Sequence, residues 1–413
     1  MAGSPLPGVA PHEGERTITD TPTPARAADI ADLARDAGIR TVHVLAWRDL
    51  GDVEAGGSEL FTARINAIWA EAGLDLTMRT SYAQGQKVNG ERDGYRIVRR
   101  AGRMMSFPTT ILTEVANQYG RADAVVEVWN GVPFLSPVWY RGPRVVFLHH
   151  VHRHMWDEVL GPRAAQFGKV LEGRIAPPFY RRTPILTLSE SSRQEIIQLL
   201  GIPARNITVN SPGIDARFGP GGELAAKPTI VTVGRLTPTK RFDEMIRVVD
   251  AARATHHDLQ LVIVGDGYER DDLEALVDDL DARSWVHMPG YVTDDELIEL
   301  YRQAWLVAAA STAEGWGMTL TEAAACGTPA VATDIAGHRD SVADGKSGVL
   351  VGSSRAMVAE ITRLIGDTEA RSRLAEGARK HAAQFTWEAA AYNAFVPLAQ
   401  QAMQRRRGGS RRP

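Results

Sequence analysis

The sequence predicts an α/β protein with two domains, each built around a parallel β-sheet. Strand-like and helical segments alternate between residues 41 and 210, and the alternation starts again at residue 229. Between the two stretches, residues 218–228 are rich in glycine and proline, a composition that is typical of a linker. Alternating strands and helices form βαβ units, in which the strands pair in parallel. Two Rossmann-like halves joined by a short linker are the simplest architecture with this pattern.

Residues 25–214 are predicted to form the first domain. They follow a leader at residues 1–24 that contains five prolines and no apolar core, so we expect it to be disordered. Apolar residues at near-helical spacing predict a helix over residues 26–37, and a second helix is expected at residues 58–71. The predicted strands lie at residues 41–47, 75–79, 95–99, 124–129, 144–149, 185–189 and 207–210.

A linker at residues 215–227 precedes the second domain, which is expected to span residues 228–386. A final helix is predicted over residues 387–404, and the tail at 405–413 has five arginines and no apolar face, so we expect it to be solvated. The strands of the second domain are predicted at residues 229–233, 260–264, 285–288, 305–309, 330–332 and 349–351. Its helices are predicted at residues 243–254, 269–280, 294–303, 319–325, 354–365 and 369–384.

Charge and composition exclude several classes of protein. Lys and Arg number 47 and Asp and Glu number 50, a formal net charge of −3, whereas a general nucleic-acid binder would usually be clearly basic. The single cysteine, Cys326, excludes a disulfide scaffold. No apolar run approaches the roughly 18 residues that a membrane-spanning helix needs. We therefore expect a cytoplasmic protein that binds no nucleic acid.

The segment from Glu314 to Glu322 carries the strongest functional signal. It joins a predicted strand to a predicted helix, and its two glycines would let a ligand approach the backbone closely. Both glutamates could accept hydrogen bonds from sugar hydroxyls, although a capping carboxylate beside a surface loop would give the same pattern. The amides at the start of the helix, where an anion is favoured, belong to Met318, Thr319 and Leu320.

A second turn, from Val233 to Arg241, also joins a strand to a helix through a glycine. Arg235 and Lys240 could reach one diphosphate from the two ends of this turn. As exposed turn charges, the same two residues would bind nothing. A nearby Gly265-Asp-Gly267 turn lacks the third glycine of a dinucleotide-binding fingerprint, so a dehydrogenase is not expected.

Two loops of the first domain are further candidates. Gly56 and Gly57 would let backbone amides approach a ligand, or they would simply lead into a helix with Ser58 as its N-cap. Residues 87–103 contain six cations, which would either form a solvated loop or bind an anionic ligand.

Histidines cluster after the predicted strand at residues 144–149. They allow a metal site, a contact between one histidine and a polar substrate, or a structural histidine. The substrate contact is favoured because ligands of open α/β sheets bind beyond the carboxyl ends of the strands. The cluster consists of His149, His150, His152 and His154, and the nearby carboxylates are Asp157 and Glu158.

Together these segments resemble glycosyltransferase family 4, whose members are retaining enzymes with the GT-B fold. The resemblance covers residues 41–388. It implies two Rossmann-like domains that face each other across a cleft, and a final helix that returns to the first domain. The matching segments are Glu314 and Glu322, eight residues apart, Gly234-Arg-Leu with Lys240, Gly56-Gly-Ser-Glu59, the strand ending in His149, and Asn210-Ser-Pro-Gly-Ile-Asp215.

The resemblance also implies roles for the matching residues. Arg235 and Lys240 would bind the donor diphosphate, and Glu322 would hold the ribose. Glu314 would hold the transferred sugar, which His149 or its neighbour His150 would contact after domain closure. The candidate catalytic residues are therefore His149, Arg235, Lys240 and Glu314. The implied donor-binding residues are Gly57, Arg235, Lys240, Tyr291, Val292, Glu314, Gly315, Trp316, Gly317, Met318, Thr319, Leu320 and Glu322; Trp316 stands where the family most often has Phe.

The implied reaction transfers a hexose-type sugar from a UDP- or GDP-linked donor to an acceptor hydroxyl, with retained anomeric configuration. Arg235 and Lys240 would stabilise the leaving diphosphate, so neither a metal ion nor a cofactor is expected. A nucleotide-sugar epimerase and a non-catalytic nucleotide-sugar-binding protein would share these motifs and stay as alternatives. A metal-dependent hydrolase that uses the histidines is a more distant one.

The acceptor is expected on the first domain, along residues 82–103 and 152–182. The second stretch mixes aromatic and basic side chains. This mixture would suit a lipid-linked or phosphorylated acceptor and a peripheral contact with the inner membrane face. A helix and loop packed into the core would have the same composition, and a soluble metabolite or a polysaccharide would serve equally well as acceptor.

Overall fold

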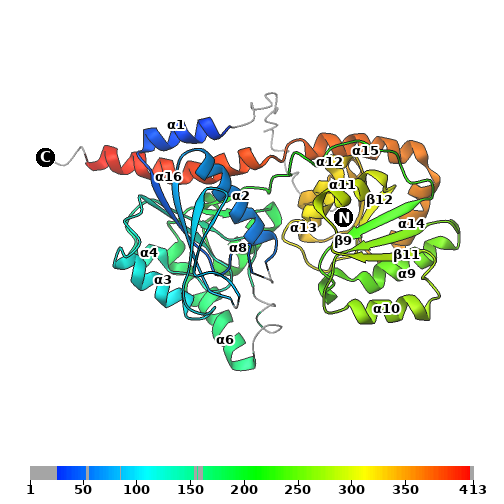
Figure 1. Cartoon of the computed structure of the whole chain (residues 1–413), viewed down its shortest axis with the longest axis horizontal. Coiled ribbons are helices and arrows are strands. Elements are labelled where there is room, and N and C mark those ends of the chain that lie inside the picture. Colours follow the sequence, from blue (N-terminus) through cyan, green and yellow to red (C-terminus); the bar gives the residue numbers. More distant parts are fainter. Residues whose placement is uncertain (1–25, 53–54, 84, 153–155, 157–160, 410–413) are drawn as a thin grey trace, which may run out of the picture.

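The computed structural model describes residues 26–52, 55–83, 85–152, 156 and 161–409. Within these residues two separate sheets account for the two lobes of Figure 1, one coloured blue to green and the other green to orange. The α/β class predicted from the sequence is therefore confirmed. The expected leader at residues 1–24 and the end of the tail at 410–413 lie outside the described residues.

The first sheet has eight strands in the order β3-β4-β2-β1-β5-β6-β7-β8. Every neighbouring pair is parallel except β3 and β4, which are antiparallel. The central strand β5 is buried along its whole length, as expected of a parallel strand covered on both faces. The strands are β1 (Thr41–Leu45), β2 (Asp75–Thr80), β3 (Asn89–Arg92), β4 (Tyr95–Arg99), β5 (Ala124–Val128), β6 (Arg144–Phe147), β7 (Ile185–Thr187) and β8 (Ile207–Val209).

The β3–β4 hairpin was not predicted from the sequence. Its turn is Asp93-Gly94, and both residues have positive φ, 45° and 80°. Two such residues form the tight turn that joins antiparallel strands with the right twist. The Asp-Gly pair could therefore have predicted this hairpin.

The helices of the first lobe include several for which the sequence predicts no bounds. They are α1 (Ala27–Ala37), α2 (Gly57–Glu71), α3 (Ser106–Val115), α4 (Ser136–Trp139), α6 (Pro162–Val170), the π-helical turn η1 (Leu171–Ile175), α7 (Pro177–Tyr180), α8 (Glu190–Leu200) and the 3₁₀ turn η2 (Ala204–Asn206).

The second sheet has six parallel strands in the order β11-β10-β9-β12-β13-β14. Its strands are β9 (Thr229–Val233), β10 (Gln260–Val264), β11 (Val286–Gly290), β12 (Leu306–Ala309), β13 (Ala330–Thr333) and β14 (Gly348–Val351). Its helices are η3 (Pro238–Lys240), α9 (Phe242–Arg253), α10 (Arg270–Asp279), α11 (Asp294–Gln303), α12 (Met318–Cys326), α13 (Ala336–Ser341), α14 (Ser354–Gly366) and α15 (Thr368–Ala382).

The segment between the sheets is held against the second lobe. Arg302 Nε donates to the carbonyl oxygen of Gly219 at 2.9 Å, and Trp305 Nε1 donates to that of Ala225 at 2.9 Å. Part of the linker at residues 215–227 therefore lies against the C-terminal end of α11.

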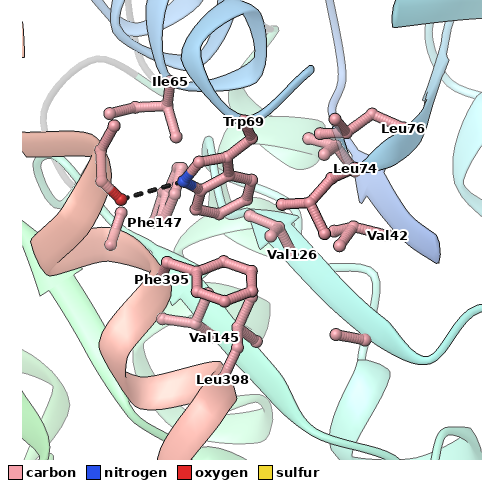
Figure 2. Packing of buried hydrophobic residues seen from close by; sticks show 14 of the residues in the cluster. Val42, Ile65, Trp69, Leu74, Leu76, Val126, Val145, Phe147, Phe395 and Leu398 are labelled. Carbon is pink, nitrogen blue, oxygen red and sulfur yellow. Dashed lines mark hydrogen bonds between the residues drawn. The ribbon is translucent and has the colours of Figure 1, made fainter. Parts of the chain in front are cut away.

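The last helix, α16 (Trp387–Gly409), lies along the first lobe beside α1 (Figure 1). Figure 2 shows Phe395 and Leu398 of α16 in the same core as Trp69 of α2. The indole Nε1 of Trp69 donates to the carbonyl oxygen of Ala391 at 2.9 Å. α16 is thus a structural part of the first domain.

One boundary of the predicted tail is wrong. Residues 405–409 are helical and continue α16, although residues 405–407 are exposed as expected. Arginine has a high helix propensity, so a helix that is already packed continues through a run of arginines. Among the described helices, none has both the length and the apolarity that crossing a membrane requires.

Candidate active site between the two domains

The loops that follow β1 and β9 meet between the domains. An Arg235 guanidinium nitrogen donates to the carbonyl oxygen of Ala55 at 2.9 Å. A Cβ built on Gly57 would lie 3.7 Å from Met318 Sδ, so the start of α2 faces the start of α12. The structure therefore brings Gly57, Arg235 and Met318 together from two domains. Glu54, at the start of the first loop, lies outside the described residues.

The two strongest sequence motifs are joined by an ion pair. Lys240 Nζ, on η3, contacts Glu314 Oε1, on the loop after β12. The hydroxyl of Ser311 donates to the same carboxylate oxygen at 3.0 Å. Both charged side chains are only partly buried, so they are accessible from outside the protein. Lys240, expected at the phosphate, and Glu314, expected at the sugar, therefore lie in direct contact.

Gly317 sets the entry into α12. Its φ of 101° is in the left-handed region that favours glycine, and a Cβ there would lie 3.1 Å from Ser341 Oγ. The amide of Leu320 donates to the carbonyl oxygen of Gly317 at 3.0 Å. Helix geometry therefore leaves the amides of Met318 and Thr319 for an anion. Within the segment, the ring of Trp316 is buried and packs edge-on against Phe385 with centroids 5.2 Å apart.

Glu322, in the second turn of α12, accepts a hydrogen bond from the Tyr301 hydroxyl at 3.4 Å. Burial raises the pKa of its carboxyl group to about 7. The carboxylate is therefore partly protonated near neutral pH, and a ligand that donates hydrogen bonds would favour its charged form. Tyr291, which the resemblance implies is a donor-binding residue, is 76% exposed, whereas Val292 packs against the core of the second domain.

His149 is buried at the end of β6. Its ring packs edge-on against Phe61 with centroids 5.0 Å apart, and neither ring nitrogen has a hydrogen-bond partner in the described part of the chain. Burial lowers its pKa to about 3, and the pKa of His150 is lowered to about 3 for the same reason. Both rings are therefore neutral. No hydrogen bond joins His149 to Glu314. The approach of these two residues on domain closure stays a prediction.

His152 and Trp156 pack around Glu172 of η1. The buried carboxylate accepts from the backbone amide of His152 at 3.0 Å and from Trp156 Nε1 at 2.8 Å. His154, Asp157 and Glu158 lie outside the described residues. Among the residues that are described, no three His, Cys, Asp or Glu side chains form a group that could hold a metal ion.

The basic stretch at residues 87–103 supports the loop after β1. Arg99 donates two hydrogen bonds to Asp49, at 2.6 and 2.9 Å, and both side chains are buried. Arg103 pairs with Asp52 at 3.1 Å. The interpretation of this stretch as a solvated loop is therefore wrong for Arg99, because its side chain is buried and paired with Asp49. The sequence could not indicate this pair, since Asp49 lies fifty positions earlier in the chain.

Comparison with known proteins identifies the family. A family model described as glycosyl transferases group 1 matches residues 217–381. A D-inositol 3-phosphate glycosyltransferase from Thermobispora bispora is 32% identical over 403 residues, which cover 85% of this chain and 91% of that protein. The chain belongs to the group 1 glycosyltransferases. Other relatives with the same name align over about half of their own length, 51% and 50% in two cases.

Solved structures show the fold of this glycosyltransferase. Sucrose-phosphate synthase from Thermosynechococcus elongatus is 18% identical and superposes with a TM-score of 0.71 over 90% of this chain and 100% of its own. Anabaena HepE in complex with UDP-glucose is 19% identical, with a TM-score of 0.64 over 89% of this chain and 99% of its own. The glycosyltransferase therefore has the GT-B fold.

The sequence analysis missed one element of this glycosyltransferase that supports the segment from Glu314 to Glu322. Helix α13 lies under the loop that carries Glu314. A Cβ on Gly337 would lie 2.8 Å from the amide nitrogen of Trp316, so only glycine fits there. His338 is fully buried, and its Nδ1 is 2.9 Å from the carbonyl oxygen of Thr333. The short α13 has no hydrophobic periodicity that would have predicted it.

Proposed function

We propose that this glycosyltransferase transfers a hexose-type sugar from a UDP-linked donor to an acceptor hydroxyl, with retained anomeric configuration. The observation that supports the proposal is the Lys240–Glu314 ion pair, which joins the cation proposed for the donor phosphate to the carboxylate proposed for the sugar. UDP is the favoured nucleotide because the solved complexes of Anabaena HepE contain UDP or UDP-glucose.

In the proposed reaction the protein stabilises the charge that develops on the leaving diphosphate. Arg235, Lys240 and the amides of Met318 and Thr319 supply this stabilisation, so no metal ion is required. A double displacement would need a carboxylate nucleophile against the anomeric carbon. We favour departure and attack on the same face, with the leaving phosphate accepting the proton of the acceptor hydroxyl. The neutral ring of His149 can exchange hydrogen bonds with the sugar.

Calorimetric titration of UDP, GDP and ADP, alone and as hexose conjugates, tests the donor site. We expect UDP to bind and the Arg235→Ala variant to lose most of this affinity. A folded protein that binds none of these nucleotides would overturn the proposal. Conversion of the donor without an acceptor would indicate an epimerase, and binding without turnover on a broad acceptor panel would indicate a binding protein. Loss of activity in EDTA would contradict metal independence.

We propose that the acceptor is polyhydroxylated and lies at the carboxyl edge of the first sheet. Trp47 Nε1 and Ser81 Oγ, after β1 and β2, are buried without a hydrogen-bond partner in the described part of the chain. A hydroxylated acceptor would satisfy such groups. The named activity of the relatives makes D-inositol 3-phosphate the first acceptor to test, with unphosphorylated inositol as its control. Equal turnover of both would exclude a phosphate requirement.

A peripheral membrane contact is a second proposal for the first domain. Phe167, Ile175 and Phe179 are 65%, 47% and 49% exposed, which contradicts core packing for these side chains. Exposed arginines accompany them, at positions 163, 174, 181 and 182. Exposed apolar and basic side chains within one segment suit the interface of an anionic bilayer.

Vesicle sedimentation tests this contact. Anionic vesicles should pull the protein down at low salt, and neutral phosphatidylcholine vesicles should not. The Phe167→Ser, Phe179→Ser double variant should lose the binding, whereas Leu112→Ser, an exposed apolar residue on α3, serves as the control. Absence of sedimentation with anionic vesicles would remove the proposal.

A further inference from the structure

Helix α13 of the second domain contacts helix α8 of the first, and both lie where the two lobes of Figure 1 meet. Asp340 Oδ1 accepts a hydrogen bond from the backbone amide of Glu190 at 2.9 Å, and its Oδ2 accepts from that of Ser191 at 3.2 Å. The hydroxyl of Ser191 donates to the carbonyl oxygen of Ala336 at 3.0 Å. Three hydrogen bonds thus connect residues that lie about 150 positions apart in the chain.

The cap of α8 is divided between the two domains. The first amides of a helix have no acceptor within the helix. The N-cap residue Ser189 accepts from the amide of Ser192 at 3.0 Å, and the amides of Glu190 and Ser191 are satisfied by Asp340. A carboxylate at this position is also favoured by the helix dipole. The first turn of α8 is therefore completed by a side chain of the other domain.

On its other side, α13 contacts the loop that carries the donor motif. The backbone at Gly337 approaches Glu314 and Trp316 so closely that a side chain would not fit. A Cβ on Gly317 would lie 3.3 Å from the ring of His338. Any shift of α13 relative to the second domain would therefore disturb the segment that holds Glu314.

From α8 the contact continues to His149. α8 begins directly after β7, and the hydroxyl of Thr187 in β7 is 3.5 Å from the carbonyl oxygen of His149. One connected path therefore runs from Glu314 through α13, Asp340 and α8 to the strand end that carries the buried histidine. We propose that Asp340 is a positioning residue, which holds the two domains in the arrangement used for sugar transfer. Its effect on turnover rests on the proposed function, whereas the contact itself does not.

The test compares Asp340→Ala, Asp340→Asn and a matched control, Asp334→Ala. Asp334 is an exposed carboxylate close by, but its partner, Arg339 at 2.5 Å, belongs to the same domain. The measurements are amide hydrogen exchange in α8, UDP binding by calorimetry, and kcat and KM for the acceptor.

In Asp340→Ala we expect faster exchange of the amides of Glu190 and Ser191, and unchanged exchange at Ser192, which Ser189 caps. Affinity for UDP should change by less than about 2-fold, while kcat should fall by about 10-fold or more, the equivalent of a hydrogen bond to a charged group. Asp340→Asn keeps one acceptor oxygen and should recover part of the loss. Asp334→Ala should behave as the wild type.

Unchanged exchange in Asp340→Ala would show that the domain contact does not form in solution. Faster exchange with unchanged kcat would overturn the positioning role. Failure of the wild type to bind UDP would contradict the proposed function, and the exchange experiment would still decide the domain contact, so the two failures are distinguishable.

Discussion

Lys240 carries the sharpest prediction at the scale of single residues, because it joins both donor motifs. Lys240→Ala removes the cation that we propose binds the leaving diphosphate, and turnover should fall by roughly 10²–10³-fold. Lys240→Arg keeps the charge and should lose less. Lys227→Ala is the matched control, since Lys227 is an exposed lysine before β9. Near-normal turnover by a folded Lys240→Ala protein would contradict the role proposed for Lys240 at the diphosphate.

Glu322 gives the donor site a pH dependence. Its pKa is raised to about 7 by burial, and ribose hydroxyls would donate to the charged form. Donor affinity should therefore rise by roughly 10-fold between pH 6 and pH 8, with release of a proton on binding. Glu322→Gln should bind the donor weakly and without this pH dependence. Calorimetry at both pH values in buffers of different ionisation enthalpy measures both effects.

The same carboxyl group reduces stability at alkaline pH. In the unfolded chain it releases its proton near its ordinary value of 4.5, whereas in the folded state it keeps the proton up to about 7. Between these values the folded state binds more protons, so this group lowers the free energy of unfolding as the pH rises. Glu322→Gln should therefore have a higher Tm than the wild type at pH 8. An equal or lower Tm would mean that the carboxyl group is not buried as described.

At the scale of elements, the start of α12 depends on one glycine. Gly317→Ala places a Cβ at a φ of 101° beside Ser341 and His338, and should lower the free energy of unfolding by about 1–2 kcal/mol. Gly315→Ala is the matched control, because a Cβ there meets no atom within 4 Å. Urea unfolding of both variants measures the difference. Equal stability would show that the backbone at position 317 relaxes without strain.

Most elements followed from hydrophobic pattern alone. β4, β9 and β10 lie at the residues predicted for them, because each is a short segment rich in β-branched or aromatic residues. The short α13 escaped prediction because it has only six residues. β3 escaped because its sequence, Asn-Gly-Glu-Arg, is polar and pairs at a sheet edge. Local sequence carries little information about such segments.

The candidate site was predictable where its residues share a motif. Arg235, Lys240, Glu314 and Glu322 were named from strand-to-helix turns, which place them at the carboxyl edge of a parallel sheet. The pairs Arg99–Asp49 and Asp340–α8 were not, because each joins distant parts of the chain. No spacing rule predicts which carboxylate will meet which cation or helix after folding.

At the scale of the whole molecule, α16 completes the core of the first domain. Phe395 is fully buried, and its ring centroid is 5.4 Å from that of Trp69 (Figure 2). Phe395→Ala should lower the free energy of unfolding by about 3–5 kcal/mol, since it leaves a cavity. Asn393→Ala, at an exposed position of the same helix, should change it little. A small effect of Phe395→Ala in denaturant titration would mean that α16 does not pack as described.

The return of α16 makes the second domain an insertion within the first. The chain leaves the first domain after Ile214 and re-enters it at Trp387, and the two crossings lie side by side, with Ile214 bridged to Thr386. During synthesis, the second domain has all of its strands before α16 emerges, whereas the core around Trp69 is still open on one face. Connectivity therefore allows the inserted domain to close first, whereas the domain that begins the chain is completed only when α16 is available.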